Sequence, residues 1–165
     1  MDRAGIFDHD FGVELIDGRI ITRMAPIGGE HAWSVGKLNR QLIYCTDGTE
    51  YALHVQSTVS LPGDRELQPD LAIYKPNEAS HDNPTPEQTL LVVEVSDSSL
   101  RYDRTTKMEY YAEAKIPEYW VVDVRNKRVT VYTRPESGTY SSVVQVSGEE
   151  KLTACDRAFA VASIF

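Results

Sequence analysis

The order of apolar and polar residues along the chain predicts a β-hairpin followed by a helix. Residues 12–24 form the expected hairpin, because Asp17-Gly18, a dipeptide favoured in two-residue turns, joins two short apolar stretches. From Trp33 to Cys45, apolar residues recur close to the spacing of a helix, and Asp47-Gly48 ends the run. The first part of the chain is therefore expected to place a hairpin before an amphipathic helix.

Three strands are predicted next. Residues 51–61 alternate between apolar and polar side chains, which is typical of one half-buried strand. Two more strands are expected from Leu67 to Tyr74 and from Thr89 to Ser96, separated by a loop over residues 75–88. The last of these is nearly all Leu and Val without alternation, which indicates a strand covered on both faces. A single glutamate, Glu94, interrupts this apolar run.

The second half of the chain predicts a helix over residues 101–114, with Ser98 or Ser99 as its N-cap, and then three strands. These strands run from Tyr119 to Val124, from Arg128 to Thr133 and from Tyr140 to Val146. The order of elements predicts the α/β (α+β) class, with a mixed central sheet flanked by helices and an N-terminal hairpin. The length of 165 residues is that of a single domain, residues 1–165.

The composition indicates a soluble globular domain, since 41% of the residues are hydrophobic and 25% are charged. Cys45 and Cys155 have no Cys or His neighbours at the spacing of a zinc site, so we expect no structural zinc. No apolar run approaches the ~18 residues that span a bilayer, and the residues before the hairpin contain no apolar stretch of the kind found in a secretory signal. We therefore expect a cytoplasmic protein with no membrane partner.

The charge balance limits how the chain can meet nucleic acid. It holds 17 Lys and Arg against 25 Asp and Glu, which gives a net charge of -8 and a pI near 5.0. Non-specific coating of DNA needs many basic contacts to phosphates, so this class of protein is disfavoured. Any contact with DNA is expected to be local or assisted by a metal ion.

Two carboxylates are placed to face each other across the predicted sheet. Asp70 and Glu94 lie at equal distances in sequence from residue 82, close to the middle of the loop over residues 75–88. If the two strands pair symmetrically about that loop, the two carboxylates are opposed at ~5 Å and would repel. A divalent cation is the natural way to offset this repulsion, and oxygen ligands fit Mg²⁺ or Mn²⁺.

A lysine on the following helix could reach the same place. Lys107 lies one helical turn after Asp103, so the two side chains share a face, and Tyr110 and Tyr111 follow within the next turn. An ammonium group beside the carboxylates could orient a water molecule or stabilise charge growing on a phosphoryl group. The alternative is a solvated lysine paired with Asp103, and core packing is the expected role of Tyr111.

These stretches resemble the Uma-two family of restriction-endonuclease-like proteins, a branch of the PD-(D/E)XK nuclease superfamily. The resemblance covers roughly residues 11–134 and includes Glu14 to Gly18 and His31. Its motifs are Gln68-Pro69-Asp70, Glu94-Val95-Ser96, Asp103-Arg104-x-x-Lys107-x-x-x-Tyr111 and Pro117 to Asp123. It implies a nuclease core in which Asp70, Glu94 and Val95 contact Mg²⁺ and a metal-activated water hydrolyses a phosphodiester of DNA.

The sequence departs from the resemblance at two positions. The usual superfamily lysine lies two residues after the glutamate, where this chain has Ser96, so the catalytic lysine is expected to be Lys107. Where the family commonly ends the helix with glycine, this chain has Lys115. Either this residue adopts a left-handed conformation at a cost of about 1 kcal/mol, or the helix ends differently.

Three further side chains are candidates for binding substrate, each with a structural alternative. His31 lies at the start of the first helix and either lines the site or serves as a capping or core residue. Ser96 either caps the following turn or bonds to a metal-bound water. Arg104 either meets a phosphate or forms part of a solvated face.

The leading hypothesis is a Mg²⁺-dependent DNA endonuclease with Asp70, Glu94 and Lys107 as catalytic residues. The first alternative is a catalytically silent relative that binds nucleic acid or protein. A two-carboxylate glycosidase is a third class, disfavoured because no cluster of sugar-stacking aromatic residues lies near either acid. Cutting both strands of a duplex often uses a symmetric dimer, so a homodimer is one arrangement to be tested.

Overall fold

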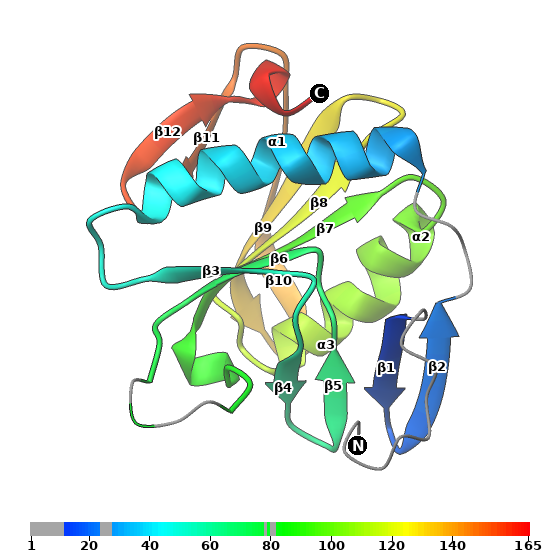
Figure 1. The fold of residues 1–165 in the computed structure, drawn as a ribbon. Coiled ribbons are helices and arrows are strands. Elements are labelled where there is room, and N and C mark those ends of the chain that lie inside the picture. The colour runs from blue at the N-terminus through cyan, green and yellow to red at the C-terminus, as the bar shows by residue number, and fades with distance from the viewer. Residues whose placement is uncertain (1–11, 24–27, 78, 80–81) are drawn as a thin grey trace.

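The computed structural model describes residues 12–23, 28–77, 79 and 82–165. Its centre is a six-stranded mixed sheet in the order β10-β9-β8-β7-β6-β3, in which β7 and β8 are parallel and the other pairs antiparallel (Figure 1). The strands are β3 (Ala52–Val55), β6 (Leu71–Tyr74), β7 (Thr89–Ser96), β8 (Glu118–Asp123), β9 (Arg128–Glu136) and β10 (Thr139–Ser147). The predicted α+β class with a mixed central sheet is confirmed.

A smaller antiparallel sheet contains the predicted N-terminal hairpin, in the order β2-β1-β5-β4. Its strands are β1 (Gly12–Ile16), β2 (Arg19–Arg23), β4 (Val59–Leu61) and β5 (Arg65–Leu67). Asp17 and Gly18 form the turn, and both have positive φ, as a two-residue hairpin turn requires. The expected hairpin is confirmed.

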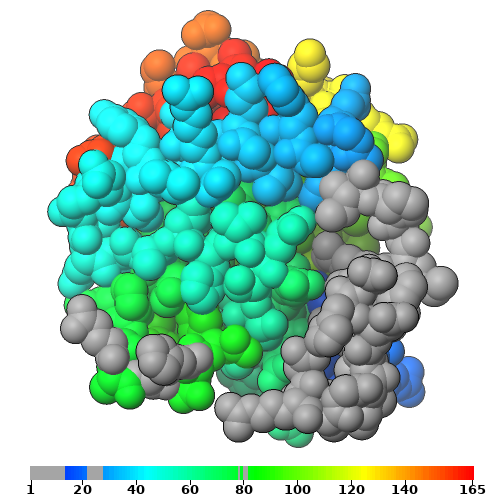
Figure 2. Space-filling model, viewed as in Figure 1, coloured from blue at the N-terminus to red at the C-terminus, as the bar shows by residue number. Residues whose placement is uncertain are grey.

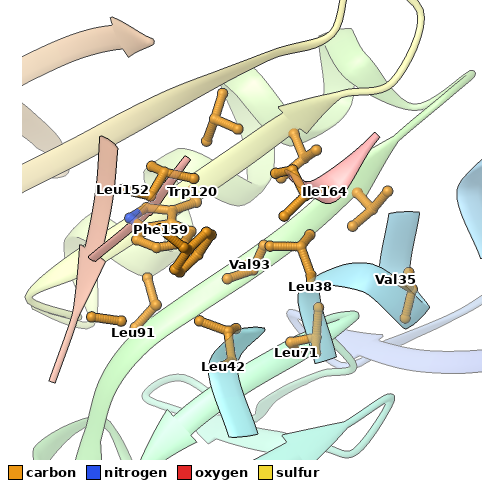
Figure 3. Close-up of a cluster of buried hydrophobic side chains, with 14 of the residues drawn as sticks. Val35, Leu38, Leu42, Leu71, Leu91, Val93, Trp120, Leu152, Phe159 and Ile164 are labelled. Carbon is orange, nitrogen blue, oxygen red and sulfur yellow. The ribbon is translucent and has the colours of Figure 1, made fainter. Parts of the chain in front are cut away.

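Helix α1 (Gly29–Thr46) confirms the first predicted helix and covers one face of the main sheet. Its inward side chains, Val35, Leu38 and Leu42, pack with Leu71 and Val93 of the sheet (Figure 3). In the space-filling view, α1 forms a band across the upper part of the visible face (Figure 2). Alternate residues of β6 and β7, among them Ala72 and Val92, face the opposite side of the sheet. There they form a second hydrophobic core with Tyr111 and Ala112 of the next helical region.

The helix predicted over residues 101–114 is present and contains a wider turn. It consists of α2 (Leu100–Tyr102), a π-helical turn (Asp103–Lys107) and α3 (Met108–Glu113). The N–H of Met108 donates to the carbonyl of Asp103, five residues earlier, as in a π-helix. Such turns are often found at functional sites.

At the end of this helix, Lys115 adopts φ 60° in the left-handed region, which is the first of the two helix endings considered from the sequence. The N–H of Ile116 donates to the carbonyl of Tyr111, and the N–H of Lys115 donates to the carbonyl of Ala112. This is the bonding pattern of a Schellman motif, and buried Ile116 supplies its apolar contact.

Two strand predictions were wrong in their boundaries. The single strand expected over residues 51–61 is divided between β3 and β4, because the chain turns at Gln56 with φ 49° and enters the other sheet. The strand expected from Leu67 to Tyr74 is divided as well, since Pro69 lacks the N–H that a ladder needs. Thus β5 ends at Leu67 and β6 begins at Leu71.

The C-terminal part of the chain completes the first core. It contains β11 (Lys151–Ala154), β12 (Arg157–Ala160) and a short 3-10 helix (Val161–Ile164), which the sequence pattern did not predict; a second 3-10 helix (Pro86–Gln88) precedes β7. The rings of Phe159 and Trp120 lie 6.2 Å apart, and Leu152 and Ile164 pack around them (Figure 3). Trp120 is fully buried.

In the part of the chain that the structure describes, no helix is long and apolar enough to cross a membrane.

Candidate active site

The pairing of β6 with β7 brings Asp70 next to Glu94. The register joins Leu71 to Val93 and Ala72 to Val92, so continuing it by one residue beyond β6 sets Asp70 opposite Glu94. The carboxylates are 3% and 1% exposed, respectively. The symmetric register inferred from the sequence is therefore present, and it places both acids at the same end of the strand pair.

The carboxylate of Asp70 continues the hydrogen-bond ladder of β7 where the backbone of β6 has ended. Its Oδ2 atom accepts a hydrogen bond of 2.8 Å from the N–H of Val95. The Nε2 atom of His31, in the first turn of α1, lies 3.2 Å from the same oxygen. The structure thus places His31 beside Asp70, whereas the N-cap of α1 is Gly28.

Glu94 is held by two side chains from the helical segment. The Nζ atom of Lys107 lies 2.7 Å from Oε1 of Glu94, and the hydroxyl of Tyr111 donates to the same oxygen at 3.0 Å. Much of the charge of Glu94 is therefore offset by an ammonium group of the protein itself. From the sequence alone, a divalent cation was expected to offset the charge of this carboxylate.

The π-helical turn explains how one helix can present several buried polar side chains. Asp103, Lys107 and Tyr111 recur every four residues, and all three are buried. In a uniform α-helix, residues four apart drift by about 40° around the axis at each step. Because a π-turn holds more residues per turn, it reduces this drift and keeps the three side chains on one face.

Asp103 does not serve as a surface partner for Lys107, which was the structural alternative for that lysine. Its Oδ2 atom accepts hydrogen bonds from the hydroxyls of Ser96, at 2.7 Å, and of Ser99. Lys107 is fully buried and donates to Glu94. Ser96 therefore joins the end of β7 to the start of the helical segment through a side-chain hydrogen bond, while the N-cap of that segment is Ser99.

Glu14 is a residue of the site that the sequence analysis did not select. It lies on β1, is 1% exposed, and accepts a hydrogen bond of 2.8 Å from Nζ of Lys107. A signal was present, because Glu14 shares its strand face with buried Ile16, two residues later. A glutamate on the buried face of a strand is unusual, and Glu94 was selected from the sequence for the same reason.

Tyr111 combines the expected core packing with a polar contact. It is fully buried, and its ring lies 4.9 Å from that of Tyr119. Burial, followed by the nearby charge of Glu94, raises the pKa of Tyr111 well above its ordinary value. The hydroxyl therefore stays protonated and acts as a fixed donor to Glu94.

Two other predicted residues, Arg104 and Val95, have different surroundings. Arg104 is beside β8 and β9, with Nη2 3.7 Å from Oδ2 of Asp123 and 3.3 Å from the hydroxyl of Thr130. The side chain of Val95 is buried in the first core, while its backbone N–H contacts Asp70. His31 therefore contacts Asp70, Ser96 contacts Asp103, and Arg104 lies toward Asp123.

The donor set fits a hard cation only if the ion takes further ligands from water or the main chain. Among the residues that the structure describes, no three His, Cys, Asp or Glu side chains are grouped so that they could hold a metal. Asp70 and Glu94 offer oxygen atoms alone, and Mg²⁺ is commonly bound by one or two carboxylates and several waters. The described side chains therefore match magnesium better than zinc.

Comparison with known proteins supports the same kind of fold. The chain matches the Uma2 (Uma-two) family, described as "Putative restriction endonuclease", over residues 3–159. It is also similar to a crystal structure from Anabaena variabilis, described as a "putative nuclease belonging to DUF820", with a TM-score of 0.73 and 14% sequence identity. That similarity covers 93% of this chain and 89% of the other, and it concerns the fold. A search of curated proteins gave no match. Because the family match spans nearly the whole sequence, the chain belongs to the Uma-two family of restriction-endonuclease-like proteins.

Proposed function

We propose that this protein is a Mg²⁺-dependent or Mn²⁺-dependent endonuclease that hydrolyses phosphodiester bonds of DNA. The observation that supports this most is the strand register, which sets buried Asp70 opposite buried Glu94 at one end of β6 and β7, with the Lys107 ammonium 2.7 Å from Glu94. Two acids can hold a metal ion that activates water, and an amine can stabilise charge on the phosphoryl group, so these groups suit metal-assisted hydrolysis of a phosphodiester. The family match makes nucleic acid the expected substrate.

In this proposal, Asp70 and Glu94 hold the metal ion, with Val95 contributing from the main chain. When bound, the ion would lower the pKa of a water molecule and stabilise negative charge on the phosphate. Val95 already orients Asp70 through its N–H, and Tyr111 orients Glu94. Both carboxylates are therefore positioned by hydrogen bonds before any substrate arrives, which favours catalysis.

Lys107 would orient the attacking water or stabilise the charge that develops on the phosphoryl oxygens. His31 lies beside Asp70 at the N-terminal end of α1 and could contact a phosphate from that side. Ser96 keeps the start of the helical segment close to the end of β7, and this fixes the position of Lys107 relative to Glu94. Arg104 would contact the DNA backbone farther from the bond that is cut.

A catalytically silent protein that binds nucleic acid or protein is the second candidate. It is favoured by the fact that Lys107 already contacts two carboxylates within 2.8 Å, as in a purely structural buried ion pair. The net charge of -8 also weighs against tight binding of DNA without a metal. In this case the fold would be retained and the acids would serve stability alone.

Cleavage of plasmid and single-stranded DNA separates the candidates. We expect cutting with Mg²⁺ or Mn²⁺, no cutting with EDTA, and at least ~10²-fold slower cutting by Asp70→Asn and Glu94→Gln. Glu109→Gln is the matched control, because Glu109 is exposed on α3 and should leave the rate unchanged. Calorimetry with Mg²⁺ should show binding that both site variants lose.

The other outcomes have distinct meanings. Wild-type protein that binds DNA but neither binds metal nor cuts would support the silent relative. Hydrolysis of DNA that continues in EDTA would exclude the metal-dependent mechanism. Hydrolysis of oligosaccharides in EDTA, with no cutting of DNA, would instead support the glycosidase alternative. Cutting by Asp70→Asn at the wild-type rate would remove that residue from the proposed site.

A further inference from the structure

We propose that Glu14 is a positioning residue that holds Lys107 in place for the reaction. The inference rests on the proposed function and adds to it a residue from the N-terminal hairpin. Glu14 and Glu94 lie on different sheets, and their Oε1 atoms are 2.8 Å and 2.7 Å, respectively, from Nζ of Lys107. The ammonium group is thus held between two fixed acceptors.

One acceptor alone would fix a lysine poorly. The side chain of lysine has four rotatable carbon–carbon bonds, so holding it in one conformation costs rotamer entropy. Tyr111 and Lys107 both contact Glu94 from the helical segment, whereas Glu14 approaches Lys107 from β1. Two acceptors on separate elements define a position for the ammonium rather than only a distance from Glu94.

Glu14 also connects the lysine to the segment that carries Asp70. The same Oε1 atom lies 3.3 Å from the backbone N of Gln68, which donates its hydrogen to it. Gln68 is two residues before Asp70, in the loop that separates β5 from β6. A single buried oxygen therefore links the amine to the backbone beside one of the two acids of the site.

The hairpin is attached to the helical segment by a second, separate contact. Arg65 on β5 forms 2.6 Å ion pairs with Asp17 at the hairpin turn and with Glu113 on α3, and its guanidinium lies 4.4 Å from the centre of the Tyr110 ring. In addition, Leu15 of β1 pairs with Glu66 of β5. Because these contacts hold the hairpin in place, a change at Glu14 is expected to release the ammonium of Lys107 without releasing the hairpin.

Two variants of Glu14 separate the position of the Lys107 ammonium from the negative charge of Glu14. In Glu14→Gln, the amide oxygen can still accept hydrogen bonds from Lys107 and from Gln68, so the geometry is largely retained. In Glu14→Leu, both hydrogen bonds are lost while the side chain stays similar in size. A misplacement of about 1 Å near a reacting centre can reduce the rate by ~10²-fold. We therefore expect the two variants to differ in kcat.

The first experiment measures steady-state cleavage of a DNA oligonucleotide with Mg²⁺. We expect kcat to fall by ~10²-fold in Glu14→Leu and by less than ~10-fold in Glu14→Gln, with KM within about twofold of wild type in both. Glu66→Leu is the control, because Glu66 is exposed on the neighbouring strand and should retain wild-type kcat. Unchanged kcat in Glu14→Leu, or a loss confined to KM, would overturn the inference.

The second experiment does not depend on catalysis and uses urea unfolding of Glu14→Gln, Lys107→Met and the double variant. If Glu14 and Lys107 act as a unit, the double variant should be more stable than Lys107→Met alone, because it removes the charge of one of the two buried acids that share the ammonium. Strictly additive losses would refute the coupling. A wild-type protein that cuts no DNA but shows this coupling would count against the proposed nuclease and not against the contact.

Discussion

Lys107→Met tests the central electrostatic feature of the molecule. Methionine nearly matches the length and volume of lysine but removes the ammonium, so two buried carboxylates, Glu14 and Glu94, would be left facing the same apolar side chain. Their Oε1 atoms cannot lie farther apart than the sum of their two distances to Nζ, which are 2.8 Å and 2.7 Å. The variant therefore converts an attraction into a repulsion at short range.

Two independent estimates give the size of the effect. Two like charges ~5 Å apart at an effective dielectric constant of ~20 repel by about 3 kcal/mol. Removing one partner from buried ion pairs destabilises proteins by about 3–5 kcal/mol in mutational studies. Lys107 is fully buried, so screening by solvent does not reduce these values. For a chain of this size, the loss corresponds to a fall in Tm of roughly 10 °C.

The assay is urea unfolding in EDTA, followed by circular dichroism. With an m-value of about 2 kcal/mol per molar, the midpoint should fall by roughly 2 M while m stays constant. Lys75→Met is the matched control, because Lys75 forms an ion pair with Glu50 in which both side chains are more than half exposed. This control removes the same charge, and its midpoint should remain near that of wild type.

Equal shifts of the unfolding midpoint in Lys107→Met and Lys75→Met would contradict this prediction. If Lys107→Met shifted the midpoint no more than Lys75→Met, the ammonium would not be neutralising buried acids in the folded protein.

Three further outcomes are expected. Lys115→Gly should raise the free energy of unfolding by about 1 kcal/mol in urea titrations, because the residue has φ 60°, and a lower stability would contradict this. Burial lowers the pKa of His54 below 6.5, so its contribution to stability is present above pH 6.5 and is lost as pH falls through the lower folded pKa; an NMR titration midpoint above 6.5 would refute it. Ser96→Ala removes a donor to buried Asp103 and should cost about 1–3 kcal/mol in urea unfolding, and a change below ~0.5 kcal/mol would show that the bond is dispensable.

The pairing of Asp70 with Glu94 was accessible from the sequence because antiparallel register is nearly fixed by the loop that joins two strands. The structure does contain an irregularity, a register shift between Ile73 and Tyr74. It lies on the loop side of the strands, where Tyr74 pairs with Thr89, and leaves the pairing at the other end unchanged. The symmetric argument was therefore correct at the position that matters for the site.

The division of residues 51–61 between two sheets was not accessible in the same way. Alternation identifies which side chains of a strand are buried, but it does not identify the sheet that buries them. The chain turns at Gln56 with positive φ, a conformation that is usually adopted by glycine or asparagine. No such residue marks the turn, so the pattern was read as one continuous strand.

The contact of Glu14 with Lys107 could not be predicted from the local sequence pattern, because 93 residues separate the two in sequence. Periodicity and turn residues act over short distances, so they were enough to predict the local elements, the buried character of β7 and the pairing of neighbouring strands. The position of the hairpin against the helical segment, and the sharing of one lysine by two acids, became known from the folded structure. Such contacts depend on how separate elements pack together, and no local pattern of apolar and polar residues specifies that packing.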